Sequence, residues 1–404
     1  MLLSDLDYPL PKDKIALFPT EDRPAAKLLC VDRASGACSH RIFRDLPELL
    51  RPTDLLVLNN TKVLPARLFG KRATGGKVEA LLLKEVDLNV WEALLKPGGR
   101  IKDGERIFFA SEIAAVPAPQ GPRNDRHCEE PQRGDEAISL TGEVLPSAEP
   151  HSGKRRIRFE GEGVKEKIKG LGHIPLPPYI DRPDQASDRS MYQTVFAEQE
   201  GAVASPTAGL HFDKPLLEAL ARMGIEVAPV TLHVSYGTFQ PITVEHVEEH
   251  QMFEEEYEIT EEAARKINAA KRAGRRVIVC GTTCVRALES AAVAGGQATS
   301  ACHSCEGGNP VLDPRLKHSG MTESKNPAGP FMIQPGKGKT SIFIYPPYEF
   351  KIVDGLITNF HMPKSTLLAM VSAFLGYEQL MAAYRTALQK DYRFASYGDA
   401  MLIS

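Results

Sequence analysis

The chain lacks the features that mark secreted, membrane-spanning and disulfide-stapled proteins. It has 404 residues, of which 42% are hydrophobic, yet no apolar run approaches the length of a membrane span. The first residues, MLLSDLDYPLPKDK, have no basic start followed by an apolar core, so no signal peptide is evident. The seven cysteines form no disulfide-like framework, and their number is odd. We therefore expect a cytoplasmic protein.

Nucleotide-binding and metal-binding motifs are also missing or weak. The chain contains no GxGxxG and no GxxxxGK[ST], so neither a Rossmann dinucleotide site nor a P-loop is supported. One CxxC is present, but a zinc site needs further ligands at suitable spacing. Here the pair and its available partners are Cys302, Cys305, Cys128, His127, His303 and His318. We therefore expect no metal site. The net charge of −3 does not indicate nucleic acid, so any such site must be a local patch.

The length and the hydrophobic pattern predict two kinds of domain. Strand-like and helix-like segments alternate through the second half, which favours a mainly parallel sheet flanked by helices, an α/β fold. From residue 65 onward, short alternating runs are separated by glycine-bearing turns, a pattern typical of an antiparallel β-barrel. We expect a discontinuous α/β domain over 1–64 and 165–404, with a smaller barrel domain inserted over 65–164.

Two segments break these patterns. Residues 117–153 and 295–339 carry many prolines and charges and show little periodicity. Such composition is typical of disordered insertions on a protein surface. We predict that both are disordered.

The stretch from residue 172 to 242 is unusually dense in polar and aromatic side chains. Tyr179, Asp181, Arg182 and Tyr192 follow a proline-stiffened entry on loop-like backbone. Thr207 and His211 come just before a helix that Asp213 is expected to cap. Free backbone N–H groups at that helix start can meet an anion. The alternative is a proline-rich surface loop leading into an ordinary amphipathic helix.

Polar residues also follow three apolar strands. Asn59, Asn60 and Thr61 end one strand; Thr282 and Thr283 begin a helix after another; Asn359 and His361 follow a third. In open α/β sheets such positions face a crevice. The alternatives are turn-forming asparagines and threonines that only cap a helix. Three histidines at comparable positions favour a shared site: His211, His233 and His361.

A basic edge lies at the start of the barrel-like region. Lys62, Arg67, Lys71, Arg72 and Lys77 all fall within sixteen residues. The usual explanation of such a run is a solvated strand face. The alternative is a local nucleic-acid patch.

Taken together, several long motifs resemble those of the S-adenosylmethionine:tRNA ribosyltransferase-isomerase family of the queuosine pathway. They are DLLVLNNTKVLPARLFG, GHIPLPPYI, GAVASPTAGLHF, VTLHV, GTFQP, GTT, VRALES, TNFH, PKSTLL and YRFASYGDAM. The resemblance covers nearly the whole chain and lapses over the two predicted insertions. The chain departs from the family's pattern at Ser235 and Tyr236, where two small residues are expected, and near Phe253, where a histidine is expected. It also stops soon after GDAMLI, without the short tail expected of the family.

The resemblance implies a fold and a reaction. A small β-barrel domain is expected beside a larger α/β domain. The enzyme is expected to transfer and isomerise the ribosyl moiety of S-adenosylmethionine onto 7-aminomethyl-7-deazaguanine at the tRNA wobble position. The product is epoxyqueuosine, with adenine and methionine released. S-adenosylmethionine is consumed as substrate, no further cofactor is implied, and we expect a monomer without membrane contact. The alternatives are a non-catalytic RNA-binding module and a small-molecule α/β transferase.

The chemistry restricts the roles that the candidate residues can take. The positive sulfur acidifies the neighbouring C–H, so a histidine or carboxylate can act as the base. His211, His233 and His361 are the candidates for proton transfer, with His211 first. The predicted substrate-binding residues are Asn60, Thr61, Arg67, Tyr179, Asp181, Arg182, Tyr192, Thr207, Phe239, Thr282, Thr283, Arg286 and Asn359.

Overall fold

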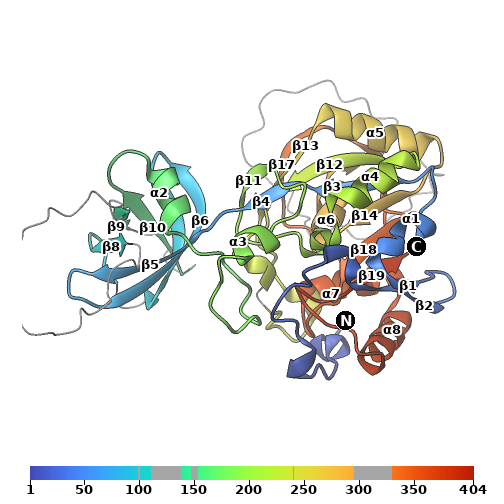
Figure 1. The fold of residues 1–404 in the computed structure, drawn as a ribbon, viewed down its shortest axis with the longest axis horizontal. Helices are drawn as coiled ribbons and strands as arrows, with labels where there is room; N and C mark the ends of the chain where they lie inside the picture. Colours follow the sequence, from blue (N-terminus) through green and yellow to red (C-terminus); the bar gives the residue numbers. More distant parts are fainter. Residues whose placement is uncertain (99–100, 111–137, 147–152, 240, 295–329) are drawn as a thin grey trace, which may run out of the picture.

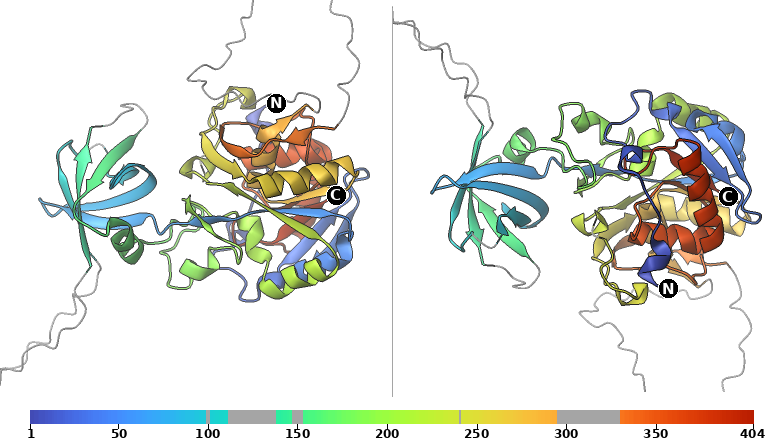
Figure 2. Two further views of the ribbon diagram at one scale, coloured as in Figure 1. Left: turned by 90° about the horizontal axis from the view of Figure 1, so that it is seen from above. Right: turned by 90° about the horizontal axis from the view of Figure 1, so that it is seen from below.

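A barrel and a larger α/β unit stand side by side, joined by a narrow neck (Figures 1 and 2). The structure is a computed structural model and describes residues 1–98, 101–110, 138–146, 153–239, 241–294 and 330–404. Within the described residues the strands form one nine-stranded sheet, one closed barrel and two small two-stranded sheets. The resemblance-based expectation of a barrel beside an α/β domain is confirmed.

The large sheet has the order β17-β13-β12-β3-β14-β18-β19-β1-β2. Its strands are β1 (Lys27–Val31), β2 (Cys38–Ile42), β3 (Leu55–Asn59), β12 (Glu226–Leu232), β13 (Glu255–Ile259), β14 (Val277–Cys280), β17 (Gly336–Thr340), β18 (Gly355–Asn359) and β19 (Ala400–Ile403). Neighbours pair in parallel through β12-β3-β14-β18 and between β19 and β1. The other four pairings are antiparallel. The sheet is thus mixed, and the prediction of a mainly parallel sheet is not confirmed.

Helices cover both faces of this sheet (Figure 1). They are α1 (Leu46–Leu49), α4 (Lys214–Arg222), α5 (Glu261–Arg272), α6 (Thr282–Ala291), α7 (Thr366–Leu375) and α8 (Tyr377–Gln389). Leu46 and Leu220 belong to the core on one face, and Ile267 and Leu288 to the core on the other. The expected N-cap is found at α4, where the side chain of Asp213 accepts from the Leu216 N–H at 2.8 Å. The helix covering that was predicted is therefore confirmed.

The length and composition of the helices bear on whether one of them could span a membrane. No single helix in the described ranges is long and apolar enough to cross a membrane. Helices α7 and α8 meet that test only as a pair bent by 113°.

The barrel closes in the order β10-β7-β6-β5-β8-β9, and every pairing in it is antiparallel. Its strands are β5 (Arg67–Arg72), β6 (Lys77–Asp87), β7 (Val90–Lys96), β8 (Arg106–Ala110), β9 (Ser139–Leu145) and β10 (Lys154–Phe159). Gly142 allows this closure, because a Cβ there would lie 2.6 Å from the Ile157 side chain. The barrel predicted from the spacing of short strands is confirmed.

The two predicted insertions are narrower than expected. Strand β9 lies inside 117–153, β16 (Met332–Ile333) lies inside 295–339, and β17 begins inside it and ends at Thr340. The prediction of disorder is wrong for these strands. Residues 117–137, 147–152 and 295–329 lie outside the described part of the chain.

The neck consists of two strands that pair with each other. β4 (Thr61–Val63) leads into the barrel, and β11 (Gln199–Ala202) follows the return segment and runs parallel to β4. Helix α2 (Val164–Leu171) precedes that return, and its Ile168 packs into the barrel core. The predicted domain boundary at 164/165 therefore separates this helix from the core that it covers. We propose that the barrel unit extends to Leu171.

Candidate active site

A cavity of about 380 Å³ opens where β14 and β18 end. The turn after β14 uses Gly281, whose φ of +89° favours glycine and whose position begins α6. Side chains from separate motifs meet in this cavity. Its place at the ends of two parallel strands is that of the crevice expected in an open α/β sheet. Six predicted site residues line it: Tyr179, Thr207, Thr282, Thr283, Asn359 and His361.

Four further polar residues of this cavity were not predicted. They are Ser205, Thr358, Ser396 and Ser365, and each lies within a motif of the family, in ASPTAGLHF, TNFH, FASYGDAM and PKSTLL respectively. Ser205 is buried, and its hydroxyl has no hydrogen-bond partner among the described residues. Small hydroxyl residues carry little sequence signal, which explains why these positions were missed.

His361 is the histidine that lines this cavity. Its Nε2 lies 2.8 Å from the Thr358 hydroxyl, and its backbone N–H donates to the Tyr384 hydroxyl at 2.9 Å. Tyr8 donates a further hydrogen bond to its carbonyl oxygen. Burial lowers the pKa of His361 to about 3. The imidazole is therefore held in one orientation and is neutral at pH 7.

His211 lies behind the cavity wall. It ends a short 3-10 turn, Thr207–His211, and its ring packs 5.0 Å from that of Phe43. Its Nε2 and the Oδ1 of Asn359 are both buried, and neither makes a hydrogen bond of good geometry within the described structure. Burial lowers the pKa of His211 to about 4, and neighbouring Asn359 opposes that shift. The imidazole is therefore kept neutral mainly by burial.

His233 faces a different cavity, of about 640 Å³, between the barrel and the large sheet. Its Nδ1 lies 2.8 Å from the Thr61 hydroxyl, and burial lowers its pKa. The three histidines therefore do not meet in one cavity, and the expectation of a shared site is wrong. The predicted Thr61 contacts this histidine and lines neither cavity.

A chain of hydrogen bonds nevertheless connects the two cavities. From His233 it passes to Thr61, whose N–H donates to Asn59 Oδ1 at 3.1 Å. Asn59 Nδ2 then donates to the Thr283 hydroxyl at 2.9 Å. The first cavity's threonine and the second cavity's histidine are thus tied to the same end of strand β3.

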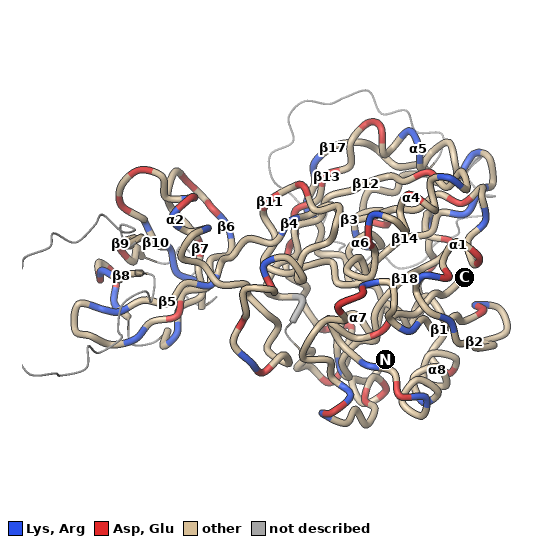
Figure 3. The backbone as a smooth tube through the Cα atoms, viewed as in Figure 1, with Lys and Arg blue, Asp and Glu red and all other residues tan. Residues whose placement is uncertain are grey.

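The larger cavity is a groove lined by residues of both charge signs and by aromatic residues. Figure 3 shows that basic and acidic residues alternate along the backbone of both units. Lys169 pairs with Glu200 at 2.8 Å, Lys339 pairs with Glu254 at 2.7 Å, and an ion pair joins Lys84 of the barrel to Glu256 of the sheet. The aromatic lining residues are Trp91, Tyr236 and Phe253. Lysine and aromatic side chains are residue types that contact single-stranded nucleic acid, and here they share the lining with six glutamates.

A family model described as a queuosine biosynthesis protein matches residues 3–403. The chain belongs to this family. It is 44% identical to the S-adenosylmethionine:tRNA ribosyltransferase-isomerase of Desulfitobacterium hafniense, and 44% identical to the protein of that name from Symbiobacterium thermophilum. Both alignments cover all of this chain and all of the relative. A crystal structure of S-adenosylmethionine tRNA ribosyltransferase from Thermotoga maritima is 30% identical, covers 99% of this chain and 100% of its own, and gives a TM-score of 0.47.

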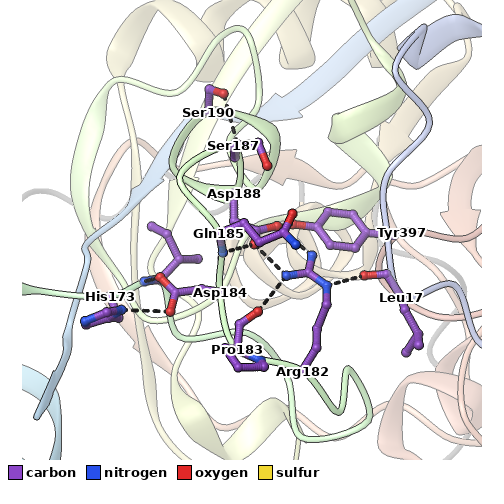
Figure 4. Close-up of polar contacts among 11 residues, drawn as sticks. Leu17, His173, Arg182, Pro183, Asp184, Gln185, Ser187, Asp188, Ser190 and Tyr397 are labelled. Carbon is purple, nitrogen blue, oxygen red and sulfur yellow. Dashed lines mark hydrogen bonds and ion pairs between the residues drawn. The ribbon is translucent and has the colours of Figure 1, made fainter. Parts of the chain in front are cut away.

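In this member of the queuosine biosynthesis family, three predicted arginines lie in ion pairs away from the 380 Å³ cavity. Arg182 makes two hydrogen bonds to Asp188, at 2.7 and 2.8 Å (Figure 4). Arg286 is buried in an ion pair with Glu255 behind the groove wall. Arg67 pairs with a glutamate on the adjacent barrel strand at 3.3 Å. The prediction that these arginines bind substrate is not supported by their positions.

Four other predicted residues also lie outside the cavities or outside the described side chains. Asn60 accepts a hydrogen bond from Thr231 at 2.7 Å and directly follows the carboxyl end of strand β3. Tyr192 is fully buried in a small core, and Asp181 is exposed to solvent. The side chain of Phe239 is not described.

No metal site is evident in the described part of this family member. Its described residues contain no group of three histidine, cysteine, aspartate or glutamate side chains that could hold a metal ion. The CxxC at Cys302 and Cys305 and its candidate partners Cys128, His127, His303 and His318 lie outside the described residues.

Proposed function

We propose that this chain transfers and isomerises the ribosyl moiety of S-adenosylmethionine onto 7-aminomethyl-7-deazaguanine at the wobble position of a tRNA. The products are epoxyqueuosine in the tRNA, adenine and methionine. Full-length relatives at 41 to 44% identity that carry the enzyme's name support this proposal. The single observation that carries it is the convergence of the PTAGLHF, GTT, TNFH and FASYGDAM motifs on one cavity.

The 380 Å³ cavity is the proposed site for S-adenosylmethionine, which is consumed and not regenerated. Its volume lies within the range of about 300 to 1,000 Å³ that is usual for small-molecule sites. Thr282 and Thr283 open helix α6, where hydroxyls and free N–H groups suit the methionine carboxylate. Tyr179 supplies an aromatic face for adenine.

His361 is the proposed proton acceptor. It is the histidine that reaches the cavity, and its neutral imidazole is the form that accepts a proton. Thr358 engages Nε2, which leaves Nδ1 for the substrate. The low pKa makes the ring a weak base, and the acidity of a C–H next to a sulfonium lowers the basicity that the step requires. His211 acts through Asn359, which is the neighbour that it shares with the cavity.

The groove between the barrel and the sheet is the proposed site for the tRNA anticodon. Its lysines suit phosphates, and its aromatic rings suit an unstacked base. His233 stands in the groove and connects through Thr61 and Asn59 to the other cavity. Since both cavities are built from one chain, a monomer is sufficient. A tRNA substrate also favours the cytoplasm.

One experiment tests the reaction against its two alternatives. The protein is incubated with S-adenosylmethionine and a tRNA that carries 7-aminomethyl-7-deazaguanine, with the same tRNA carrying guanine as control. We expect adenine, methionine and a mass increase in the modified tRNA only. Binding of tRNA without adenine release would support an RNA-binding module, and turnover without tRNA would support a small-molecule transferase.

A further inference from the structure

The loop of residues 395–397 forms one wall of the 380 Å³ cavity. Ala395 and Ser396 line it, and the Ser396 hydroxyl lies 2.8 Å from the hydroxyl of Tyr179. Asn359 Nδ2 donates to the carbonyl oxygens of Ala395 and Ser396 at 3.0 and 3.2 Å. This loop therefore places a hydroxyl, an aromatic ring and an amide around the same space.

The backbone of this loop is strained. Ala395 has a φ of +69°, in the left-handed region that side chains with a Cβ rarely adopt. Such a conformation is unfavourable for a residue with a Cβ and persists only when its surroundings fix it. The contacts that hold the loop therefore decide the shape of the cavity wall.

One of these contacts reaches the loop from outside the cavity. The Tyr397 hydroxyl donates to Asp188 Oδ1 at 2.7 Å (Figure 4). The Asp188 side chain is buried and also accepts from the Gln185 N–H at 2.7 Å. Asp188 is not among the residues that line either cavity. Its carboxylate thus contacts the loop without reaching the space where a substrate would lie.

Asp188 is itself fixed by Arg182. Besides its two bonds to Asp188, the guanidinium donates to the carbonyl oxygens of Leu17 and Pro183, both at 2.9 Å. It also stacks on the ring of Phe18, 4.4 Å from the ring centroid. The guanidinium is therefore fully engaged within the protein, and its role is to hold a carboxylate.

We propose that Asp188 and Tyr397 are positioning residues for the reaction. The carboxylate, held by Arg182, anchors the Tyr397 hydroxyl and so keeps loop 395–397 in the strained conformation that completes the S-adenosylmethionine cavity. This inference rests on the proposed function for the identity of the ligand. It assigns the conspicuous Arg182 to the support of the cavity wall, where the sequence had indicated substrate binding.

The test is the Tyr397→Phe variant, which removes one hydroxyl and leaves the Arg182–Asp188 ion pair intact. Steady-state kinetics of adenine release should show a KM for S-adenosylmethionine raised about 10-fold or more, the effect of one hydrogen bond to a charged group. The KM for tRNA should stay within two-fold. A purely structural defect instead lowers the folded fraction, which lowers kcat and leaves both KM values unchanged.

Two control variants match this change. Tyr392→Phe removes another buried tyrosine hydroxyl, which contacts His40 at 2.9 Å and lies outside both cavities. Asp184 lies on the same segment as Asp188, and Asp184→Asn weakens its pair with His173 (Figure 4). Both should leave the KM for S-adenosylmethionine unchanged. Asp188→Asn should raise the KM for S-adenosylmethionine less in the Tyr397→Phe background than in the parent protein, because the two groups form one hydrogen bond.

Amide hydrogen exchange gives a readout that needs no turnover. Exchange over residues 393–399 should rise in Tyr397→Phe and stay at the parental level in Asp184→Asn. The proposal is overturned if Tyr397→Phe shows unchanged exchange over this loop. It is also overturned if the parent protein is active and Tyr397→Phe has an unchanged KM for S-adenosylmethionine. If the parent protein releases no adenine, the proposed function fails, and the exchange result still decides whether Asp188 fixes the loop.

Discussion

At the residue scale, burial decides what the histidines can do. His361 and His211 have pKa values lowered to about 3 and about 4, and both side chains are almost inaccessible to solvent. Sequence position indicated which histidines to consider. It did not indicate which of them would line the 380 Å³ cavity, because that depends on how segments far apart in the chain pack together.

His361→Ala should remove the proton acceptor. Loss of a general base typically slows the chemical step by about 100- to 10,000-fold. Single-turnover adenine release by the folded variant measures this directly. The control is His40→Ala, whose imidazole contacts Tyr392 away from both cavities. A rate within a few-fold of the control would exclude His361 from proton transfer.

Acid should destabilise the fold through His211. Its folded pKa of about 4 lies below the ordinary value of 6.5, so the unfolded chain binds more protons between those pH values. The contribution is therefore present above pH 6.5 and is lost as the pH falls toward 4. The free energy of unfolding should fall between pH 7 and pH 4.5 in the parent protein. In His211→Gln this fall should be smaller by on the order of 2 kcal/mol. Urea unfolding at both pH values checks this, and equal losses in parent and variant would contradict it.

At the element scale, features that depend on neighbouring residues were predicted better than features that depend on partners far along the chain. The N-cap Asp213 was anticipated, because a cap depends on residues within one turn. At α6 the N-cap is Gly281, so the alternative that the threonines only cap the helix is wrong, and the Thr283 hydroxyl accepts from Asn59 instead. Strand direction at the sheet edges depends in the same way on partners far along the chain, which explains the missed antiparallel pairs.

The arginines illustrate the same limit. Arg67, Arg182 and Arg286 stood out as charges in or beside motifs, and each proved to have a carboxylate partner. A sequence shows the charge of a residue without showing what neutralises it. Six of the predicted residues do line the 380 Å³ cavity, since strand ends and helix starts can be recognised locally.

Strand β11 contains a glycine that leaves room for His233. Gly201 has a φ of +153°, and a Cβ there would lie 2.8 Å from His233 Cε1. Gly201→Ala should push the ring away from Thr61 and lower turnover about 10-fold or more, as expected for a misplaced group beside the reaction. Gly75→Ala is the matched control, because Gly75 also has a positive φ but open space around it. Equal turnover in the two variants would show that the position of His233 does not matter.

At the scale of the whole molecule, the sequence predicted a barrel inserted into an α/β unit, and the structure has this arrangement. The error lay at the edges of the insertions, because β9 is flanked by segments of proline-rich and charged composition that hid its short alternation. The groove and its Lys84–Glu256 ion pair could not be foreseen, since both are formed by strands from the two units.

Binding of tRNA to the groove should be sensitive to salt. Lys169 and Lys339 line the groove, so changing both to Ala should weaken tRNA binding and reduce the slope of log K against log salt by about 1 to 2. The affinity for S-adenosylmethionine should not change. Lys390→Ala, at the exposed end of α8, is the control. Filter binding at several salt concentrations makes the comparison, and an unaltered slope in the double variant would place the phosphates elsewhere.

The position of β3 determines the order in which parts of the molecule can assemble during synthesis. β3 spans Leu55–Asn59, but the strands that flank it, β12 and β14, begin only at Glu226 and Val277. All six barrel strands are made in the interval. The barrel is therefore the first large unit able to fold as the chain leaves the ribosome, while an apolar strand upstream of it stays uncovered. The centre of the sheet in the finished enzyme is thus made early and has neither of its neighbouring strands until after the barrel is complete.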